Sequence, residues 1–399
     1  MKFDVRYFAG NGFWLLVKRV VSSLSAFLLA LAAAHVLSKD VYGIYKYLLA
    51  STGIIAAFSL TGMGASLTRS VARGFEGILK KAFYLKMRFG FITTIIAFGI
   101  SIYYIVQGNN AFALVYGVFG LLFPFWDAAL LYGDFLQGKT RFKELSKLTV
   151  VLQFCLTVIL IGLMFLFPHS AVVLVIASFF VQCLFAFIYY KRIAKQAVQT
   201  SFQESDEVTG YAKHLSAINV LANISNQVEN VLLFQILGPA SLAIYAFATA
   251  IPEQIKGVLG NLGTLLFPRF AKRDIESVRA SLKSKFLFLF LIGIAVVGSY
   301  IIIAPFIYQW FFPQYIEAVF YSQIFSISLL NMTFAPSAVA LQAQKKIKEQ
   351  YLSNTVIPVA RIVSAIIFVY FLGILGIVIS RVIVRIGGSL LDLYLLYRS

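Results

Sequence analysis

Residues 35–73, HVLSKDVYGIYKYLLASTGIIAAFSLTGMGASLTRSVAR, have a counterpart later in the same chain. Residues 235–273, QILGPASLAIYAFATAIPEQIKGVLGNLGTLLFPRFAKR, align with them without a gap. Both segments begin with a short turn, continue through an Ile-Tyr pair and a mostly apolar stretch, and end in basic residues. The identical pairs are Leu37/Leu237, Ile44/Ile244, Tyr45/Tyr245, Ala50/Ala250, Ile55/Ile255, Arg69/Arg269 and Arg73/Arg273. The pattern predicts an internal repeat that divides the chain near its midpoint.

The composition indicates a membrane protein. Hydrophobic residues make up 60% of the chain and charged residues only 13%, and the mean hydropathy is +0.86. Soluble domains contain about 25% charged residues. Apolar runs of about 20 residues recur along the sequence, and each is long enough to cross a hydrocarbon core of about 30 Å. The alternating pattern of a transmembrane β-barrel is absent from the sequence.

We therefore predict an all-α polytopic membrane protein with 12 transmembrane helices in two pseudo-symmetric six-helix lobes around a central cavity. The N-lobe is expected at 1–190, a cytoplasmic linker at 191–214 and the C-lobe at 215–399. The apolar segment near the N-terminus is interpreted as the first span and not as a cleaved signal peptide. The expected spans are 15–37, 42–65, 88–107, 111–133, 147–167, 171–190, 215–237, 241–266, 286–305, 318–340, 351–372 and 374–396.

The basic residues are distributed on one side of these spans. With the N-terminus inside, 28 of the 34 Lys and Arg residues lie in segments on the cytoplasmic side, although the net charge of +18 alone would suggest nucleic acid. The positive-inside rule thus predicts cytoplasmic termini and makes a nucleic-acid partner unnecessary. Cys155 and Cys183 lie within spans, and the three histidines have no metal-ligand spacing. We expect no metal site and no cofactor.

Several charged residues lie inside the expected spans, where each ionised side chain costs about 2.5–3.5 kcal/mol on insertion scales. Arg361 and Arg385 are predicted at a similar depth near the middle of the membrane, and Arg381 one turn further out. A guanidinium group suits a pair of phosphate oxygens. Alternatively, each arginine is neutralised separately, by backbone carbonyls or by a carboxylate of another span. The charged residues of the spans are Lys46, Asp127, Glu229, Glu253, Lys256, Arg361, Arg381, Arg385 and Asp392.

The seventh expected span carries a stripe of amides, at Asn219, Asn223, Asn226 and Asn230. Their spacing places them on one face of a helix, next to Glu229. Such a stripe either holds packed helices together in lipid or lines a water-filled cleft, where amides contact sugar hydroxyls.

The eighth expected span is predicted to break at Pro252, beside Glu253 and Lys256. The spacing of these two charged residues allows an ion pair. Such a pair is either structural or part of a gate or ion-coupling site, which makes Glu229 and Glu253 the candidate coupling or gating carboxylates.

The segment 37–74, LSKDVYGIYKYLLASTGIIAAFSLTGMGASLTRSVARG, resembles the N-terminal stretch of Wzx-type polysaccharide repeat-unit flippases of the multidrug/oligosaccharidyl-lipid/polysaccharide (MOP) superfamily. FLQGKTRFKEL at 135–145 and ILGPASLAIY at 236–245 are also similar to that family. The resemblance implies alternating access and transport of an undecaprenyl-pyrophosphate-linked oligosaccharide in a cationic cavity. Expected partners are this substrate, membrane lipids, and the polysaccharide polymerase and export machinery.

Three functions are consistent with these features. The first is the flippase, with Arg361, Arg381, Arg385, Lys256 and the four asparagines in contact with the substrate. The second is a MATE-like exporter of small cationic molecules, which requires deep carboxylates without an excess of cations. The third is a membrane polymerase or glycosyltransferase, which requires a large outer loop; the longest expected loop, 305–317, is short. The flippase accounts best for the cationic excess.

Overall fold

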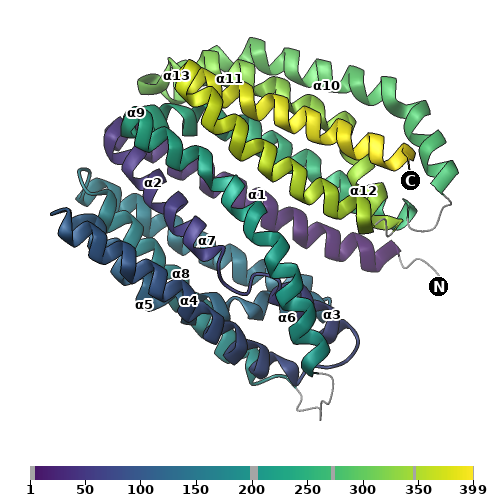
Figure 1. Ribbon diagram of the computed structural model, residues 1–399, viewed down its shortest axis with the longest axis horizontal. Coiled ribbons are helices and arrows are strands. Elements are labelled where there is room, and N and C mark those ends of the chain that lie inside the picture. Colours follow the sequence, from purple (N-terminus) through teal and green to yellow (C-terminus); the bar gives the residue numbers. More distant parts are fainter. Residues whose placement is uncertain (1–4, 198–204, 271–274, 345–346, 399) are drawn as a thin grey trace. The chain divides into compact units, whose positions relative to one another are not determined.

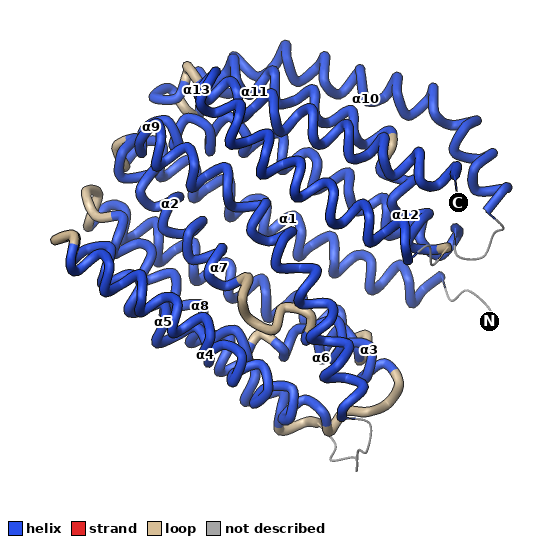
Figure 2. Tube along the Cα trace, viewed as in Figure 1, coloured by secondary structure: helices blue, strands red, loops and turns tan. Residues whose placement is uncertain are grey.

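The computed structural model describes residues 5–197, 205–270, 275–344 and 347–398. Within these ranges the chain is helical, and Figure 2 shows helices joined by short loops without a strand. Nine of the described helical segments are long and apolar enough to cross a membrane. Two of the nine contain 49 and 51 residues, which is more than one crossing requires. The all-α polytopic architecture is thereby confirmed, while the count of 12 spans stays a prediction.

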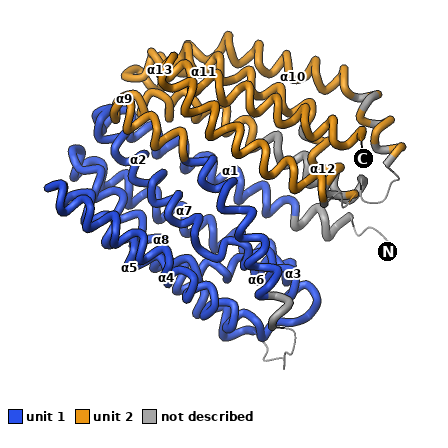
Figure 3. The backbone as a smooth tube through the Cα atoms, viewed as in Figure 1, with its two compact units in different colours: residues 1–227 blue, residues 228–399 orange. Residues whose placement is uncertain are grey.

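The chain forms two compact units, residues 1–227 and 228–399, which Figure 3 distinguishes by colour. The boundary lies inside helix α9. The expected linker 191–214 stays a prediction, because residues 198–204 lie outside the described residues. The first unit contains α1 (Val5–Val36), α2 (Lys39–Ala56), α3 (Met63–Ala72), α4 (Ile78–Val106), α5 (Asn110–Ala129), α6 (Leu131–Gly138), α7 (Phe142–Leu166), α8 (Ala171–Ala194) and the start of α9 (Ser205–Phe270) (Figure 1).

The second expected span, 42–65, is wrong as one continuous helix. Helix α2 ends at Ala56, and a loop at 57–62 precedes α3. The N–H of Gly62 donates a 2.8 Å hydrogen bond to Ser216 Oγ, which donates to the carbonyl of Ala212 at 2.7 Å. The bond from Gly62 to α9 satisfies a backbone N–H that a continuous helix would otherwise satisfy itself, which stabilises the break.

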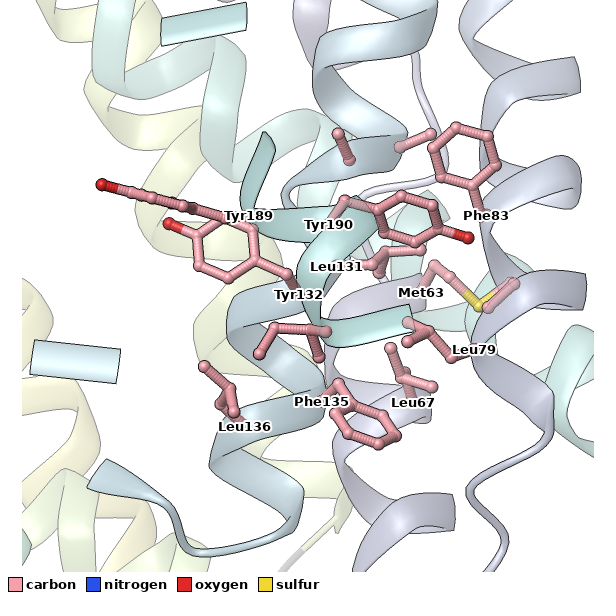
Figure 4. Packing of buried hydrophobic residues seen from close by; sticks show 14 of the residues in the cluster. Met63, Leu67, Leu79, Phe83, Leu131, Tyr132, Phe135, Leu136, Tyr189 and Tyr190 are labelled. Atoms are coloured by element: carbon pink, nitrogen blue, oxygen red, sulfur yellow. The ribbon is translucent and has the colours of Figure 1, made fainter. Parts of the chain in front are cut away.

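Helices α4 and α5 pack closely within the first unit. Thr94 Oγ1 donates to the carbonyl of Gly120 at 2.7 Å, and Ser101 Oγ donates to that of Ala113 at 2.7 Å. Small residues at such positions let helix backbones approach closely in lipid. The first unit also contains a buried apolar cluster, to which α3, α4, α6 and α8 contribute side chains (Figure 4). Figure 4 shows Phe83 beside Tyr190, whose rings are stacked with centroids 4.3 Å apart.

The second unit contains the rest of α9, α10 (Ile275–Phe311), η1 (Pro313–Tyr315), α11 (Ala318–Ser326), η2 (Ile327–Thr333), α12 (Ala335–Ala343) and α13 (Ile347–Arg398). Most of the expected outer loop 305–317 is therefore helical, because α10 continues through Pro305 to Phe311. The expected span 318–340 is divided by the 3₁₀ segment η2. Near the end of α10 the rings of Phe247, Tyr308, Phe312 and Tyr315 pack together. The Tyr308 hydroxyl holds this aromatic group to α9 by donating to the carbonyl of Phe247 at 2.7 Å.

Helices α9 and α13 are each interrupted at one glycine, Gly238 (φ 82°) and Gly373 (φ 58°). Positive φ is readily adopted only by glycine. Tyr245 bonds back to Glu229 across the first turn, and Ser364 Oγ lies 2.7 Å from Ser380 Oγ across the second. Each long helix is thus a hairpin of two antiparallel arms. The expected connections at 238–240 and between 372 and 374 are found at these turns.

The expected break at Pro252 is wrong. Among the described residues of α9, only Gly238 has non-helical backbone angles, and the helix continues through Pro252. Proline removes one backbone hydrogen bond and its ring crowds the preceding turn, but neither effect ends the helix at this position. Residues 258–270 of the second repeat segment are helical, whereas the aligned loop at 57–62 interrupts the first. The two segments therefore differ in their secondary structure, and the end of the second, 271–273, lies outside the described residues.

Candidate functional site

Among the described residues of the second unit, the most buried carboxylate is that of Glu229, on the first arm of the α9 hairpin. Its side chain is 1% exposed. It accepts hydrogen bonds from Tyr245 Oη at 2.6 Å and from Arg361 Nε at 2.6 Å, and a third from Nη1 of Arg381. A carboxylate removed from water to this degree requires such charged partners. Glu229 thereby joins the two arms of α9 to both arms of α13.

The second carboxylate, Glu253, lies on the other arm of α9. Its Oε1 accepts from Arg381 Nη2 at 2.9 Å and from Arg385 Nη2 at 2.5 Å. Arg385 also donates to Ser328 Oγ at 2.9 Å, and both guanidinium groups lie over the ring of Phe325, at 5.6 Å for Arg381 and 5.1 Å for Arg385. The Glu253 side chain is 32% exposed, far more than that of Glu229.

These residues form one continuous series of alternating charge, which we call the Arg–Glu network. Its order is Arg361, Glu229, Arg381, Glu253, Arg385. The members lie 8 to 15 residues from the hairpin turns, or about 12–22 Å along helices that rise 1.5 Å per residue. If the turns lie at the membrane surface, this distance would place the network near the middle of a hydrocarbon core of about 30 Å. Three guanidinium groups face two carboxylates, so it carries a net positive charge.

The structure brings together the three arginines and both candidate carboxylates. The alternative in which carboxylates of other spans neutralise the arginines is realised in part, because each arginine contacts a carboxylate of another helical arm. The arginines are not neutralised separately, however, since Arg381 contacts both Glu229 and Glu253. The expected Glu253–Lys256 pair is wrong: the arginines occupy the Glu253 carboxylate, and no ion pair joins it to Lys256 among the described residues. Lys256 is half-buried one turn further along α9.

The four asparagines of the amide stripe lie in different environments. Asn226 is exposed, and Asn219 and Asn230 are half-buried. Asn223 lines a cavity of about 300 Å³ in the first unit, together with Thr61, Trp126 and Asp127. The roles of the four asparagines stay predictions.

Sequence reasoning missed an ion pair in the first unit. Lys86 Nζ lies 2.8 Å from Asp127 Oδ1 and also donates to the backbone carbonyl of Asp127 at 2.9 Å, and both side chains are largely buried. Asp127 is one of the charged residues expected within the spans, whereas Lys86 lies just outside the expected span 88–107. The lone Asp within an apolar run was the available signal, because such a residue needs a partner. No group of residues that could hold a metal ion occurs in the described part of the chain.

The fold and the buried charged network define a class of protein, the multi-pass membrane proteins with the fold of MATE transporters of the MOP superfamily. The chain is similar to an inward-facing multidrug resistance MATE transporter (TM-score 0.67, 15% identity, covering 96% of this chain and 97% of the other). It is also similar to an outward-facing structure (0.68, 15%, 98% and 95%). A third similar structure is a MOP superfamily transporter from Pyrococcus furiosus, described as having a binding pocket of reversed polarity (0.62, 15%, 98% and 95%).

Residues 8–274 match the family described as Polysaccharide biosynthesis protein, and the chain belongs to that family. The resemblance found in the sequence is thereby confirmed. No curated protein matches the sequence.

Proposed function

We propose that this protein is a flippase that moves an undecaprenyl-pyrophosphate-linked oligosaccharide repeat unit across the cytoplasmic membrane by alternating access, for the synthesis of a surface polysaccharide. Both termini lie in the cytoplasm in this proposal. Family membership supports a role in polysaccharide biosynthesis, and the fold is that of transporters. The Arg–Glu network supports the pyrophosphate as the group that is recognised.

The observation that carries the proposal is the position of Glu253. Its carboxylate is bound by two arginines and is 32% exposed. Arginine binds phosphate with the same planar, charge-assisted geometry with which it binds carboxylate. A phosphate group of the substrate replaces Glu253 between Arg381 and Arg385, and Glu253 returns when the substrate leaves. The carboxylate thus keeps the arginines neutralised between transport cycles, when like charges would otherwise repel each other.

Glu229 has a different role in this mechanism. It is nearly inaccessible and accepts from three donors, so it stays in place as the permanent counter-ion of Arg361 and Arg381. When phosphate displaces Glu253, the remaining network has three arginines and one carboxylate, with Lys256 nearby. This excess of positive charge is complementary to a pyrophosphate. The sugars then contact amides such as Asn223, Asn226 and Asn230.

The charge balance also separates this function from the alternatives. An exporter of small cations needs carboxylates that are not neutralised, whereas Glu229 and Glu253 both bind arginines. A polymerase or glycosyltransferase needs a substantial extramembrane segment for its catalytic residues. The described connections expected on the outer side are short, for example 167–170 between α7 and α8. Membrane lipids, and a polymerase with its export machinery, are the partners this function requires.

The test is transport by the purified protein in proteoliposomes that contain a fluorescent lipid-pyrophosphate-linked oligosaccharide. Movement between leaflets is measured as loss of accessibility to an external enzyme or quencher. Arg361→Gln and Arg385→Gln should each abolish transport, and Lys at either position should restore it only in part. Arg385→Gln should do so with protein levels unchanged, whereas Arg361→Gln also removes a buried partner of Glu229 and should lower stability. Full transport by the double Gln variant contradicts the mechanism. Uptake of small cations without lipid movement supports the exporter instead.

A further inference from the structure

Two lysines and a tryptophan meet near the start of α7. Lys143 and Lys147 lie one turn apart on this helix, and both ammonium groups lie over the ring of Trp14 on α1, with Nζ 5.6 and 5.7 Å from the ring centroid. An ammonium group within about 6 Å of an aromatic centroid is attracted to the face of the ring. The indole therefore holds two positive charges close to one position in the first unit.

The protein does not neutralise these two charges. Both lysines are exposed, and among the described residues no carboxylate forms an ion pair with either of them. Glu144, the nearest carboxylate in the sequence, pairs instead with Arg141 at 2.5 Å. Two ammonium groups beside one ring repel each other, and an anion between them relieves this repulsion. The charges therefore suit an anion that comes from outside the chain.

The exposed face of α7 continues from the lysines into apolar residues. Val151, Phe154 and Val158 are 48%, 65% and 54% exposed. With Lys143 and Lys147 they follow the spacing i, i+4, i+8, i+11, i+15, which places all five on one face of the helix. From Lys147 to Val158 the helix rises about 17 Å, close to half of a hydrocarbon core of about 30 Å. The face thus presents cations first and then an apolar strip as long as one leaflet.

This order of groups matches a phospholipid with a negative headgroup. Tryptophan is enriched where the hydrocarbon meets the headgroups, and lysines at that level attract anionic lipids. The indole N–H of Trp14 can also donate a hydrogen bond to a phosphate oxygen. Free phosphate would leave the apolar strip uncovered. A zwitterionic headgroup would bring a cation of its own to the two lysines.

We propose that this face of α7, together with Trp14, is a binding site for one anionic phospholipid of the membrane. The lipid phosphate lies between Lys143 and Lys147, and an acyl chain follows the apolar strip. The residues of the site belong to the first unit, whereas the Arg–Glu network belongs to the second. The proposal concerns a resident lipid and not the transported substrate, so it does not depend on the proposed function.

Trp14 can report the lipid directly, because the chain contains only three tryptophans. Replacing Trp126 and Trp310 with Phe leaves Trp14 as the single emitter. The variant is reconstituted in vesicles of phosphatidylcholine and phosphatidylglycerol, in which one lipid or the other carries brominated acyl chains. Bromine quenches tryptophan emission only at short range. At equal mole fraction, we expect brominated phosphatidylglycerol to quench Trp14 more strongly than brominated phosphatidylcholine.

The two lysines are tested against a matched pair. Lys143→Gln and Lys147→Gln should each lower the relative affinity for phosphatidylglycerol about fivefold, and the double variant should be quenched equally by both brominated lipids. The double variant Lys191→Gln and Lys195→Gln is the control, because these lysines are exposed with the same spacing on α8, and Lys191 lies over a phenylalanine ring instead. The control should keep the preference. An equal loss in both pairs overturns the site and leaves only a general attraction of basic residues to anionic lipid.

Native mass spectrometry of the protein with all its tryptophans covers the case in which the single-tryptophan variant does not fold. We expect one phosphatidylglycerol to stay bound after transfer from mixed micelles, and the double variant at Lys143 and Lys147 to lose it. Equal binding of the two lipids, in whichever of these measurements is made on folded protein, overturns the proposal. Loss of the preference on addition of inorganic phosphate overturns it in favour of a soluble anion.

Discussion

Arg381 contacts Glu229 through one terminal nitrogen of its guanidinium group and Glu253 through the other. One side chain of α13 therefore joins the two arms of the α9 hairpin. The two carboxylates differ in accessibility, at 1% and 32% exposed. In the proposed mechanism Glu229 maintains the fold and Glu253 exchanges with the substrate, and the first two predictions test these two roles.

Glu253→Gln should increase affinity for a lipid pyrophosphate and slow its release. The neutral amide competes less well with phosphate for Arg381 and Arg385, because charge-assisted bonds are about twice as strong as neutral ones. Binding of labelled substrate in detergent, together with transport in proteoliposomes, measures both effects. Glu144→Gln, which alters a partly exposed ion pair with Arg141 outside the Arg–Glu network, is the control. Unchanged affinity with normal transport would show that Glu253 does not exchange with the substrate.

Glu229→Gln should destabilise the protein strongly. The change leaves the charges of Arg361 and Arg381 without a buried counter-ion, and breaking a buried ion pair costs about 3–5 kcal/mol. Thermal unfolding in detergent is the measurement, with Glu317→Gln at an exposed position as the control. A melting temperature equal to that of the control variant would contradict a structural role for Glu229.

Gly238→Ala should also lower the melting temperature. Gly238 has φ 82° and ψ 176°, a region populated almost only by glycine, and a side chain there costs about 1–3 kcal/mol. Gly298→Ala is the control, because Gly298 is helical and an added Cβ would meet nothing within 4 Å. Equal stability of the two variants would mean that the turn at Gly238 adjusts freely.

Gly62→Ala tests the loop that contributes Thr61 to the cavity. An added Cβ would lie 2.5 Å from the carbonyl oxygen of Ala212, a backbone atom that cannot move aside easily. We expect a loss of about 1–3 kcal/mol of unfolding free energy, the usual effect of overpacking, measured by thermal unfolding in detergent. Gly99→Ala, with open space around it, is the control. A melting temperature equal to that of the control variant would contradict the close packing of this loop.

Reporter fusions test the orientation in the membrane. Fusions at Gly108, His169 and Gly238 should report the outer side, and fusions at Arg73 and Lys143 the cytoplasm. The reason is the concentration of basic residues in the inner connections. An outer signal at Lys143 would contradict the assignment.

Much of the fold could be predicted from the sequence, because an apolar run of about 20 residues has few alternatives to a membrane helix. The turns at Gly238 and Gly373 were predicted for the same reason. The break after Ala56 was not, because it depends on the bond from Gly62 to Ser216, a residue 154 positions away. Pro252 illustrates the opposite error, since a local helix breaker is tolerated inside a packed helix.

The five residues of the Arg–Glu network were recognised in the sequence as charged residues of the spans. The ion pairs between them were not predicted. Arg361, Arg381 and Arg385 were identified because charge within a span is costly. Their partners could not be assigned, because Glu229 lies 132 positions from Arg361 in the sequence. The nearest opposite charge, Lys256 for Glu253, was the wrong choice, since four helical arms converge on the carboxylates.

Side-chain hydrogen bonds join the two arms within each hairpin of the second unit. Tyr245–Glu229 and Ser364–Ser380 link the paired arms close to the turns, and a Cβ on Gly373 would lie 3.5 Å from Leu237 beside the other turn. The paired arms are therefore joined at about the level of the Arg–Glu network, because Ser380 directly precedes Arg381 and Glu229 belongs to the network. Arg381 is about 12 Å along its arm from the turn, whereas the arm ends lie about 38 Å away. We expect movement between the two arms to be smallest at the network and largest at these far ends.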